Sequence, residues 1–82
     1  MQSRVLLAND APFLLEAFAG MLKPHFNVVD CAENGREALD LFMAHHPKHY
    51  SAIVLDISMP IMDGIETCQN IKRLIQERVM HD

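Results

Sequence analysis

The sequence contains no apolar run near the roughly 20 residues that a helix needs to cross a bilayer, and residues 1–20 lack a basic start followed by a continuous apolar stretch. We therefore expect neither a membrane segment nor a secretory signal, and we expect a cytoplasmic location. The 7 lysines and arginines are scattered, and the formal net charge is −4. Because neutralising phosphates requires grouped basic side chains, these features argue against direct binding of nucleic acid.

Cysteine is scarce, and repeats, low-complexity tracts and interior linkers are missing. Cys31 and Cys68 have no metal-type spacing around them, so we expect reduced thiols that line a core. A chain of 82 residues forms one domain at most, and a domain of this size buries only about 60–65% of the surface that its unfolded chain exposes. The 50% hydrophobic content therefore predicts a globular domain with a thin core.

Short apolar runs alternate with helical patterns along the chain. We predict strands over residues 3–9, 27–32 and 51–56, and helices over residues 11–23, 35–45 and 64–78. This order is typical of an α/β domain with a parallel sheet, in which the carboxyl ends of the strands meet at one edge. At the helix starts, Asp10 is a plausible N-cap, and Asn34 with Glu37 resembles a capping box.

Apolar residues at helical spacing predict the inner face of each helix. They are Leu14, Leu15, Phe18 and Leu22 in the first helix, Ala38, Leu41 and Phe42 in the second, and Ile65, Cys68, Ile71 and Ile75 in the third. His45, His46 and His49 follow the second helix, but Pro47 interrupts helical spacing there. We interpret this stretch as a solvated connection and not as a metal site.

The most informative stretch is residues 53–64, where a predicted buried strand ends in Asp56 before a turn rich in Pro and Gly. The carboxylate of Asp56 is therefore presented at the sheet edge. Asp10 follows the first strand in the same way, and two such acids can share a divalent cation. The alternative is that Asp56 only forms a turn or caps a helix and that Asp10 only caps the first helix.

Three segments, "VLLANDAPFLLEAF", "CAENGREALDLF" and "IVLDISMPIMDGIE", resemble the receiver domain of two-component response regulators and hybrid histidine kinases. The resemblance covers essentially the whole chain and implies a partial flavodoxin-like three-layer sandwich with parallel strand order 2-1-3. It implies that Asp56 is the phosphoacceptor for a histidine kinase or phosphotransfer protein. It further implies an Mg²⁺ site formed by Asp10, Asp56 and the backbone carbonyl of Ser58, with Asn9 in the outer sphere.

Two departures from the family pattern affect this expected site. Asn9 stands where the family most often has an acid, and one carboxylate fewer lowers the demand for a cation, so Mg²⁺ should bind more weakly. The family also has a Ser or Thr after a fourth strand and a Lys after a fifth, whereas this sequence stops after the third helix and is expected to be a truncated receiver. We assign neither role to a residue of this chain, because Lys23, Lys48 and Lys72 follow no strand-like run and Thr67 lies inside a helix.

Three functions compete at this point. The first is a signalling receiver, which is a phosphoacceptor and not itself an enzyme, and which can form part of a hybrid histidine kinase. The second is a pseudo-receiver that acts as an interaction or dimerisation module, because the third strand would be an open edge and the isolated chain is expected to self-associate or fold only partly. The third is an aspartate-dependent phosphatase, which Ser58 disfavours because an acid is expected there as general acid/base. A flavin site is disfavoured because residues 9–12 lack phosphate donors.

Overall fold

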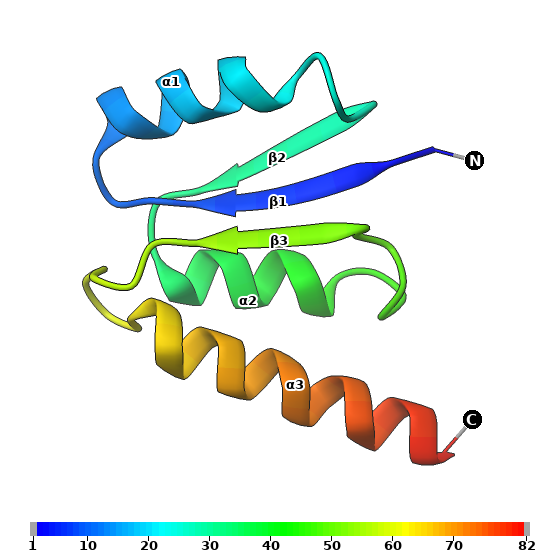
Figure 1. Cartoon of the computed structure of the whole chain (residues 1–82). Coiled ribbons are helices and arrows are strands. Elements are labelled where there is room, and N and C mark those ends of the chain that lie inside the picture. Colours follow the sequence, from blue (N-terminus) through cyan, green and yellow to red (C-terminus); the bar gives the residue numbers. More distant parts are fainter. Residues whose placement is uncertain (1, 82) are drawn as a thin grey trace.

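Strands and helices alternate in the computed structural model, which describes residues 2–81 and the side chains of residues 2–77 (Figure 1). The elements are β1 (Arg4–Ala8), α1 (Pro12–Leu22), β2 (Val28–Ala32), α2 (Gly35–Met43), β3 (Ala52–Leu55) and α3 (Gly64–His81). Each strand and helix predicted from the sequence is present, with ends that differ by a few residues.

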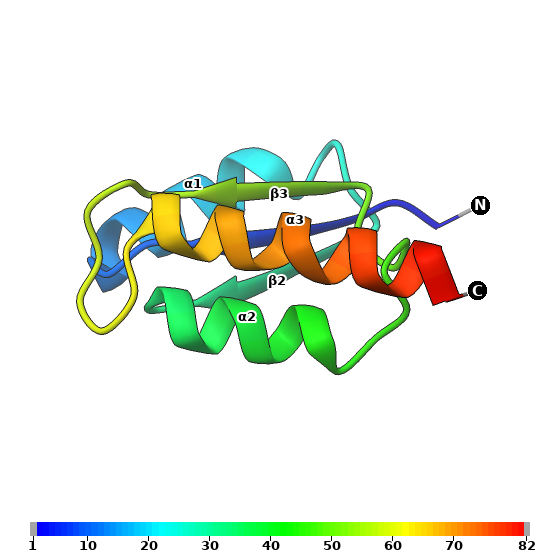
Figure 2. The same cartoon turned by 90° about the horizontal axis from the view of Figure 1, so that it is seen from below.

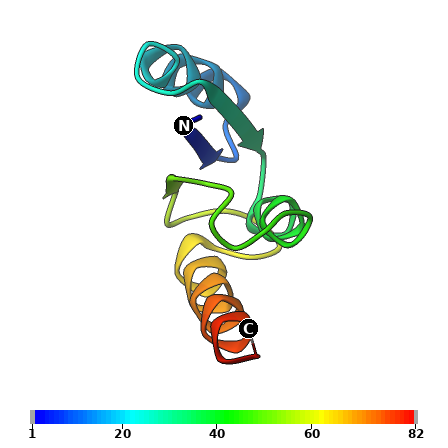
Figure 3. The same ribbon diagram turned by 90° about the vertical axis from the view of Figure 1, so that its right-hand side faces the viewer.

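The strands form one parallel sheet in the order β2-β1-β3, as the sequence predicted. Leu6 in the central strand lies opposite Asp30 of β2 and Ile53 of β3. Helix α1 covers one face of the sheet, and α2 and α3 lie on the other (Figures 1 and 3). Because side chains alternate along β1, Leu6 packs in the core beneath α2 while Leu7 packs against α1.

The inner face of α1 differs from the predicted one. Leu15 and Ala19 are buried against Leu7, whereas Leu14 and Phe18, which we expected to face the sheet, are exposed. The reason is that α1 packs on β1 and β2, so the part of this sheet face next to β3 is left uncovered. Periodicity identified the apolar residues of α1 but not which of them have a neighbour.

The prediction that Ile65 and Ile75 of α3 point into a core is also wrong. Their exposed fractions are 57% and 36%, while Ile71 is buried and Cys68 is half-buried. Helix α3 packs mainly on α2 and not over β3 (Figure 2), so one side of the helix has no cover. Both cysteines are free thiols, but Cys31 is exposed on β2 and does not line a core as predicted.

The predicted cap of α2 by Asn34 is confirmed, but the reciprocal bond of Glu37 is to the backbone N–H of Glu33 and not to that of Asn34. The Glu37 N–H donates to Asn34 Oδ1 at 2.8 Å, and the Glu37 carboxylate accepts from the Glu33 N–H at 3.2 Å. The predicted Asp10 cap of α1 is wrong, because Ala11 occupies the cap position without a side-chain bond. Asn9 Oδ1 instead accepts the Ala11 N–H at 2.9 Å, the two-residue turn that Asn side chains favour.

Candidate functional site

The two predicted acidic site residues follow neighbouring strands at one edge of the sheet. Asp56 comes directly after β3, and its N–H donates to the carbonyl of Ala8, the last residue of β1, at 3.0 Å. The next residue of the β1 chain, Asn9, donates its N–H to the carbonyl of Ala32 at the end of β2, at 3.1 Å. These bonds tie the three strand ends together. Asp10 is exposed and Asp56 is half-buried, so both residues are accessible at this edge.

Two helix starts hold the loop of residues 56–63 that carries Asp56. The Gly64 N–H donates to the Ile57 carbonyl at 3.0 Å, and the Gly35 N–H donates to the Met62 carbonyl at 3.1 Å. A Cβ atom at Gly64 would overlap the Asp56 carbonyl, and one at Gly35 would overlap the Met62 carbonyl. Glycine at these two positions therefore permits α3 and α2 to approach the loop closely.

Asp63, the acid at the end of this loop, stabilises the start of α3. Asp63 Oδ1 accepts the Glu66 N–H at 2.8 Å and so caps α3. The Asp63 carbonyl accepts the Thr67 hydroxyl at 2.7 Å, and Thr67 is fully buried. The spacing of Asp63 and Glu66 is itself a capping signal that sequence reasoning did not use. Thr67 is accordingly a packing residue.

The donors expected to bind a metal are not engaged elsewhere. Among the described residues, no hydrogen bond or ion pair uses the carboxylates of Asp10 or Asp56 or the carbonyl of Ser58. Asn9 is buried, and its Oδ1 already holds the Ala11 N–H. Two carboxylates and a carbonyl are hard oxygen donors that suit Mg²⁺, an ion that keeps several waters. Within the described part of the chain no three His, Cys, Asp or Glu side chains form a metal-binding group.

The histidine-rich stretch lies away from this edge and has a packing role. The rings of His45 and His49 stack with centroids 3.8 Å apart, and the Tyr50 ring meets His49 edge-on at 4.8 Å. These ring contacts pack the stretch against Tyr50.

The response regulator receiver domain family matches residues 5–80 of the chain, a segment that includes both acids. The chain belongs to the receiver domain family. This receiver is 38% identical over 72 residues to the chemotaxis protein CheY of Halobacterium salinarum, covering 88% of our chain and 58% of CheY. It is 37% identical over 75 residues to CheY of Bacillus subtilis, covering 90% and 60%. The chain therefore spans about three-fifths of the length of these relatives.

A histidine kinase is also among the relatives of this receiver. The peroxide stress-activated histidine kinase mak3 of Schizosaccharomyces pombe is 31% identical over 72 residues, which cover 88% of our chain and 3% of the kinase. The aligned segment is thus a very small part of that protein.

Solved receiver structures confirm the flavodoxin-like fold. CheY4 of Vibrio cholerae superposes with a TM-score of 0.81 at 24% identity, covering 95% of our chain and 62% of CheY4. A Borrelia burgdorferi structure described as a CheX-CheY-BeF3-Mg complex superposes with a TM-score of 0.80 at 33% identity, covering 88% and 54%. No helix in the described part of our receiver is long and apolar enough to cross a membrane.

Proposed function

We propose that this chain is a phosphoacceptor module of phosphorelay signalling, in which Asp56 accepts a phosphoryl group from a histidine kinase or a phosphotransfer protein. The observation that carries the proposal is the position of Asp56. Its carboxylate is half-buried at the end of β3, it is not engaged by another described residue, and it belongs to a chain with the receiver fold. The kinase relative and the Borrelia complex with magnesium and beryllium fluoride support this reading.

In the proposed reaction a carboxylate oxygen of Asp56 attacks the phosphorus of a phosphohistidine. The phosphorus–nitrogen bond of the donor breaks, its electron pair stays on the imidazole, and an acyl phosphate forms on Asp56. The hydrogen bond from the Asp56 N–H to Ala8 fixes the backbone of the nucleophile at the strand end. This positioning lowers the entropic part of the barrier.

Asp10, Asp56 and the Ser58 carbonyl would hold Mg²⁺ in this proposal, with Asn9 in the outer sphere. When bound, the ion would neutralise the negative charge that gathers as a carboxylate approaches a phosphoryl group. Because Asn9 stands where an acid would add a further negative charge, we expect Mg²⁺ to bind more weakly. Saturating the site should therefore take a higher Mg²⁺ concentration than at a site with three acids.

The direct test is phosphorylation of the purified chain by a small phosphodonor, acetyl phosphate, in the presence of Mg²⁺. We expect the intact mass to increase by one phosphoryl group. The Asp56→Asn variant should show no gain, and Asp10→Asn should show a smaller gain that more Mg²⁺ partly restores. Asp40→Asn is the matched control, because Asp40 is an exposed acid on α2 whose carboxylate pairs with Arg36.

Unchanged labelling of Asp56→Asn would show that the phosphoryl group resides elsewhere and would refute the assignment. Equal losses in Asp10→Asn and Asp40→Asn would remove Asp10 from the site.

A second candidate function has a specific observation in its favour. Among the described strands β3 pairs with β1 alone, and Val54, Ile57 and Ile65 around it are exposed. An open strand edge with apolar neighbours favours protein association. A pseudo-receiver that acts as an interaction or dimerisation module would associate with a protein partner and show no phosphoryl transfer in the same mass experiment.

A further inference from the structure

A cluster of aromatic rings lies at the end of the sheet opposite the two site acids. It belongs to residues 44–51, which connect α2 to β3 at the amino ends of the strands (Figure 1). His45 and His49 are both half-buried, and their rings stack with centroids 3.8 Å apart and planes 8° from parallel. The Tyr50 ring meets both edge-on, at 6.0 Å from His45 and 4.8 Å from His49. Two rings that can each take up a proton are therefore in direct contact.

Tyr50 anchors this cluster to the sheet. Its side chain is buried, and its hydroxyl donates to Asp30 Oδ2 of β2 at 2.7 Å. The next residue, Ser51, donates its N–H to the carbonyl of Arg4 at the start of β1, also at 2.7 Å. The histidine stack thus rests on a residue whose position is fixed by two strands. Separation of the two rings would remove the contact that holds the connection against Tyr50.

The charges next to the stack disfavour a second proton on it. Partial burial lowers the pKa of His49, and the nearby His45 and Arg4 lower it further, while Asp30 acts in the opposite direction. The Asp30 carboxylate already accepts the Tyr50 hydroxyl. The arrangement therefore favours a neutral ring at position 49.

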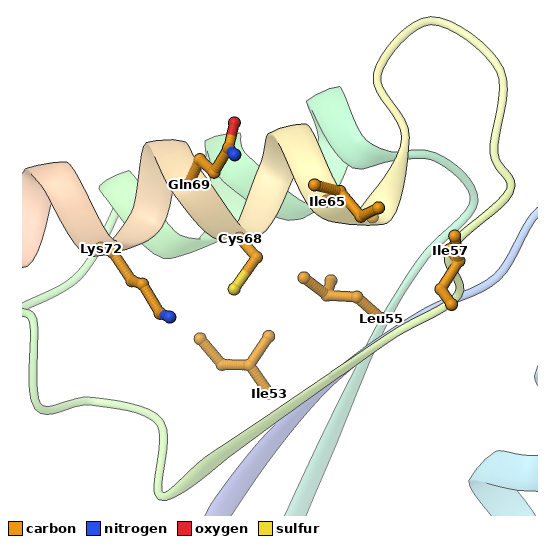
Figure 4. A pocket seen from close by; sticks show the side chains of 8 residues that line it. Ile53, Leu55, Ile57, Ile65, Cys68, Gln69 and Lys72 are labelled. Atoms are coloured by element: carbon orange, nitrogen blue, oxygen red, sulfur yellow. The ribbon is translucent and has the colours of Figure 1, made fainter.

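Helix α3 brings a further positive charge to the same end of the sheet. Lys72 extends from α3 toward β3 (Figure 4), and with Tyr50 and Phe42 of α2 it lines a cavity of about 300 Å³. Among the described residues Lys72 is the only charged side chain that lines this cavity. His46 and Lys48, in the connection itself, are exposed. The surroundings of the stack therefore offer little negative charge to neutralise a second proton.

Protonation decides whether the two rings can stay stacked. A stack with one charged ring keeps its contact, whereas two imidazolium ions in contact repel each other. At a separation of about 4 Å this repulsion changes an equilibrium constant about sixfold even in bulk water, and more where water is partly excluded. The pair therefore binds its two protons in separate steps. A histidine whose pKa is lower in the closed state favours that state above its ordinary pKa of about 6.5, and this contribution is lost as the pH falls below that value.

We propose that the stacked His45–His49 pair is a proton-sensitive latch. It holds the α2–β3 connection against Tyr50 while at most one of the two rings is charged, and it releases the connection when both are protonated. Acidification thereby loosens the start of β3, whose other end leads into Asp56. The latch does not depend on the phosphoacceptor function, because neither Asp10 nor Asp56 takes part in it.

Amide hydrogen exchange tests the latch. The His49 and Ser51 amides report on it, because they donate to the carbonyls of His46 and Arg4, and the amide of Leu6 in the central strand is the reference. Each rate is divided by the rate of an unstructured peptide at the same pH, between about pH 7.5 and 5, where histidine is the side chain whose charge ordinarily changes. No phosphodonor or Mg²⁺ is present. Toward acid the normalised rates at His49 and Ser51 should rise at least about sixfold relative to the rate at Leu6.

Two variants remove the charge and keep the ring. In His49→Phe and His45→Phe a phenyl ring can stack in the same place but cannot take up a proton, so the normalised rates at positions 49 and 51 should not change with pH. His25→Phe is the matched control, because His25 is an exposed histidine in the turn after α1, and this variant should keep the full acid response. Circular dichroism confirms that each variant is folded, and either of the first two is sufficient for the test.

The proposal is overturned if the His49 and Ser51 amides follow Leu6 at every pH. It is also overturned if a folded variant with phenylalanine at position 45 or 49 keeps the acid response. Loss of that response in His25→Phe would equally overturn it, since the response would then not come from the stack. Failure of Asp56 to accept a phosphoryl group would leave all these outcomes unaffected, so the two proposals fail separately.

Discussion

At the residue scale, close backbone contacts limit which side chains the candidate site tolerates. Gly64 starts α3 with its Cα against the Asp56 carbonyl, and the Cα of Ile57 lies within 3.1 Å of where a Cβ would be. Both neighbours are backbone atoms of the loop that carries the proposed nucleophile. They cannot move aside as a flexible side chain can, so a methyl group at this position must displace the loop or the helix.

We therefore predict that Gly64→Ala lowers the free energy of unfolding by about 1–3 kcal/mol, the usual cost of forcing an extra carbon into a packed site. Phosphorylation of Asp56 should slow as well, because its carbonyl is the atom displaced. The control is Gly20→Ala on α1, where nothing lies within 4 Å of a Cβ, and which should raise the unfolding free energy by about 0.5–1 kcal/mol. Urea denaturation measures both, and a neutral effect of Gly64→Ala would contradict the close contact.

The sequence predicted the positions of Asp10 and Asp56 because both follow apolar strand-like runs. It could not predict how the loop between β3 and α3 bends. Ile61 adopts a φ of 69°, within a tight turn in which the Met62 N–H donates to the Pro60 carbonyl at 2.7 Å. A β-branched residue disfavours this conformation, so no local preference pointed to it. The hydrogen bonds that hold the loop at both ends impose it.

At the element scale, a partly buried hydrogen bond on the α2 face of the sheet links β2 to the segment just before β3. The Tyr50 hydroxyl, just before β3, donates to Asp30 Oδ2 in β2 at 2.7 Å. Asp30 lies opposite Leu6 of the central strand, so this bond passes over β1. Burial, followed by the hydrogen bond to Asp30 and its charge, raises the pKa of Tyr50 above its usual range.

This link predicts a loss of stability in alkali. A group whose pKa is higher in the folded state stabilises the fold while it is protonated, and this contribution falls once the pH exceeds the unfolded pKa of about 10. Above that pH the unfolding free energy should fall by up to about 1.4 kcal/mol per pH unit. Tyr50→Phe should remove this part of the decrease in unfolding free energy. Because Tyr50 is the only tyrosine and tryptophan is absent, tyrosinate absorbance reports this residue alone.

Asp30→Asn separates charge from geometry in this link. The amide oxygen can still accept the Tyr50 hydroxyl, so the variant should fold while the tyrosinate midpoint moves back toward its usual value. An ordinary tyrosinate midpoint in the unmodified protein would contradict the hydrogen bond between Tyr50 and Asp30.

Helical periodicity predicted each helix but not which elements pack against its apolar face. Ala38 and Phe42 of α2 are buried as predicted because β1 and α3 enclose them. Ile65 and Ile75 of α3 have the same helical spacing and are exposed, since no strand of the described chain lies on the outer side of β3 to pack against them. Periodicity describes one helix, whereas burial depends on partners elsewhere in the fold.

At the scale of the whole molecule, the chain is flat and has more surface than its mass requires. Its extents are 39 × 33 × 16 Å and its radius of gyration is 12.5 Å, compared with about 11.7 Å for a compact domain of this length. Its accessible surface is 5369 Å², against about 5000 Å² for a typical monomer of this mass. Val54, Ile57 and Ile65, on or next to the open β3 edge, are among its exposed large apolar side chains, which makes that edge the expected origin of association.

We predict that the free chain self-associates through β3 as concentration rises, and that it does so without forming a stable closed dimer. The open edge favours pairing, but α3 occupies the space that a two-fold partner would need (Figure 3), so contacts between copies should be open-ended and weak. Sedimentation velocity under reducing conditions should show an average sedimentation coefficient that increases with concentration and has no plateau at the value of a dimer.

Val54→Lys should suppress the increase, because a lysine on an edge strand opposes pairing. Cys31→Lys, at the β2 edge, should not. A chain that stays monomeric at every concentration, or equal suppression by both variants, would show that the β3 edge does not drive association.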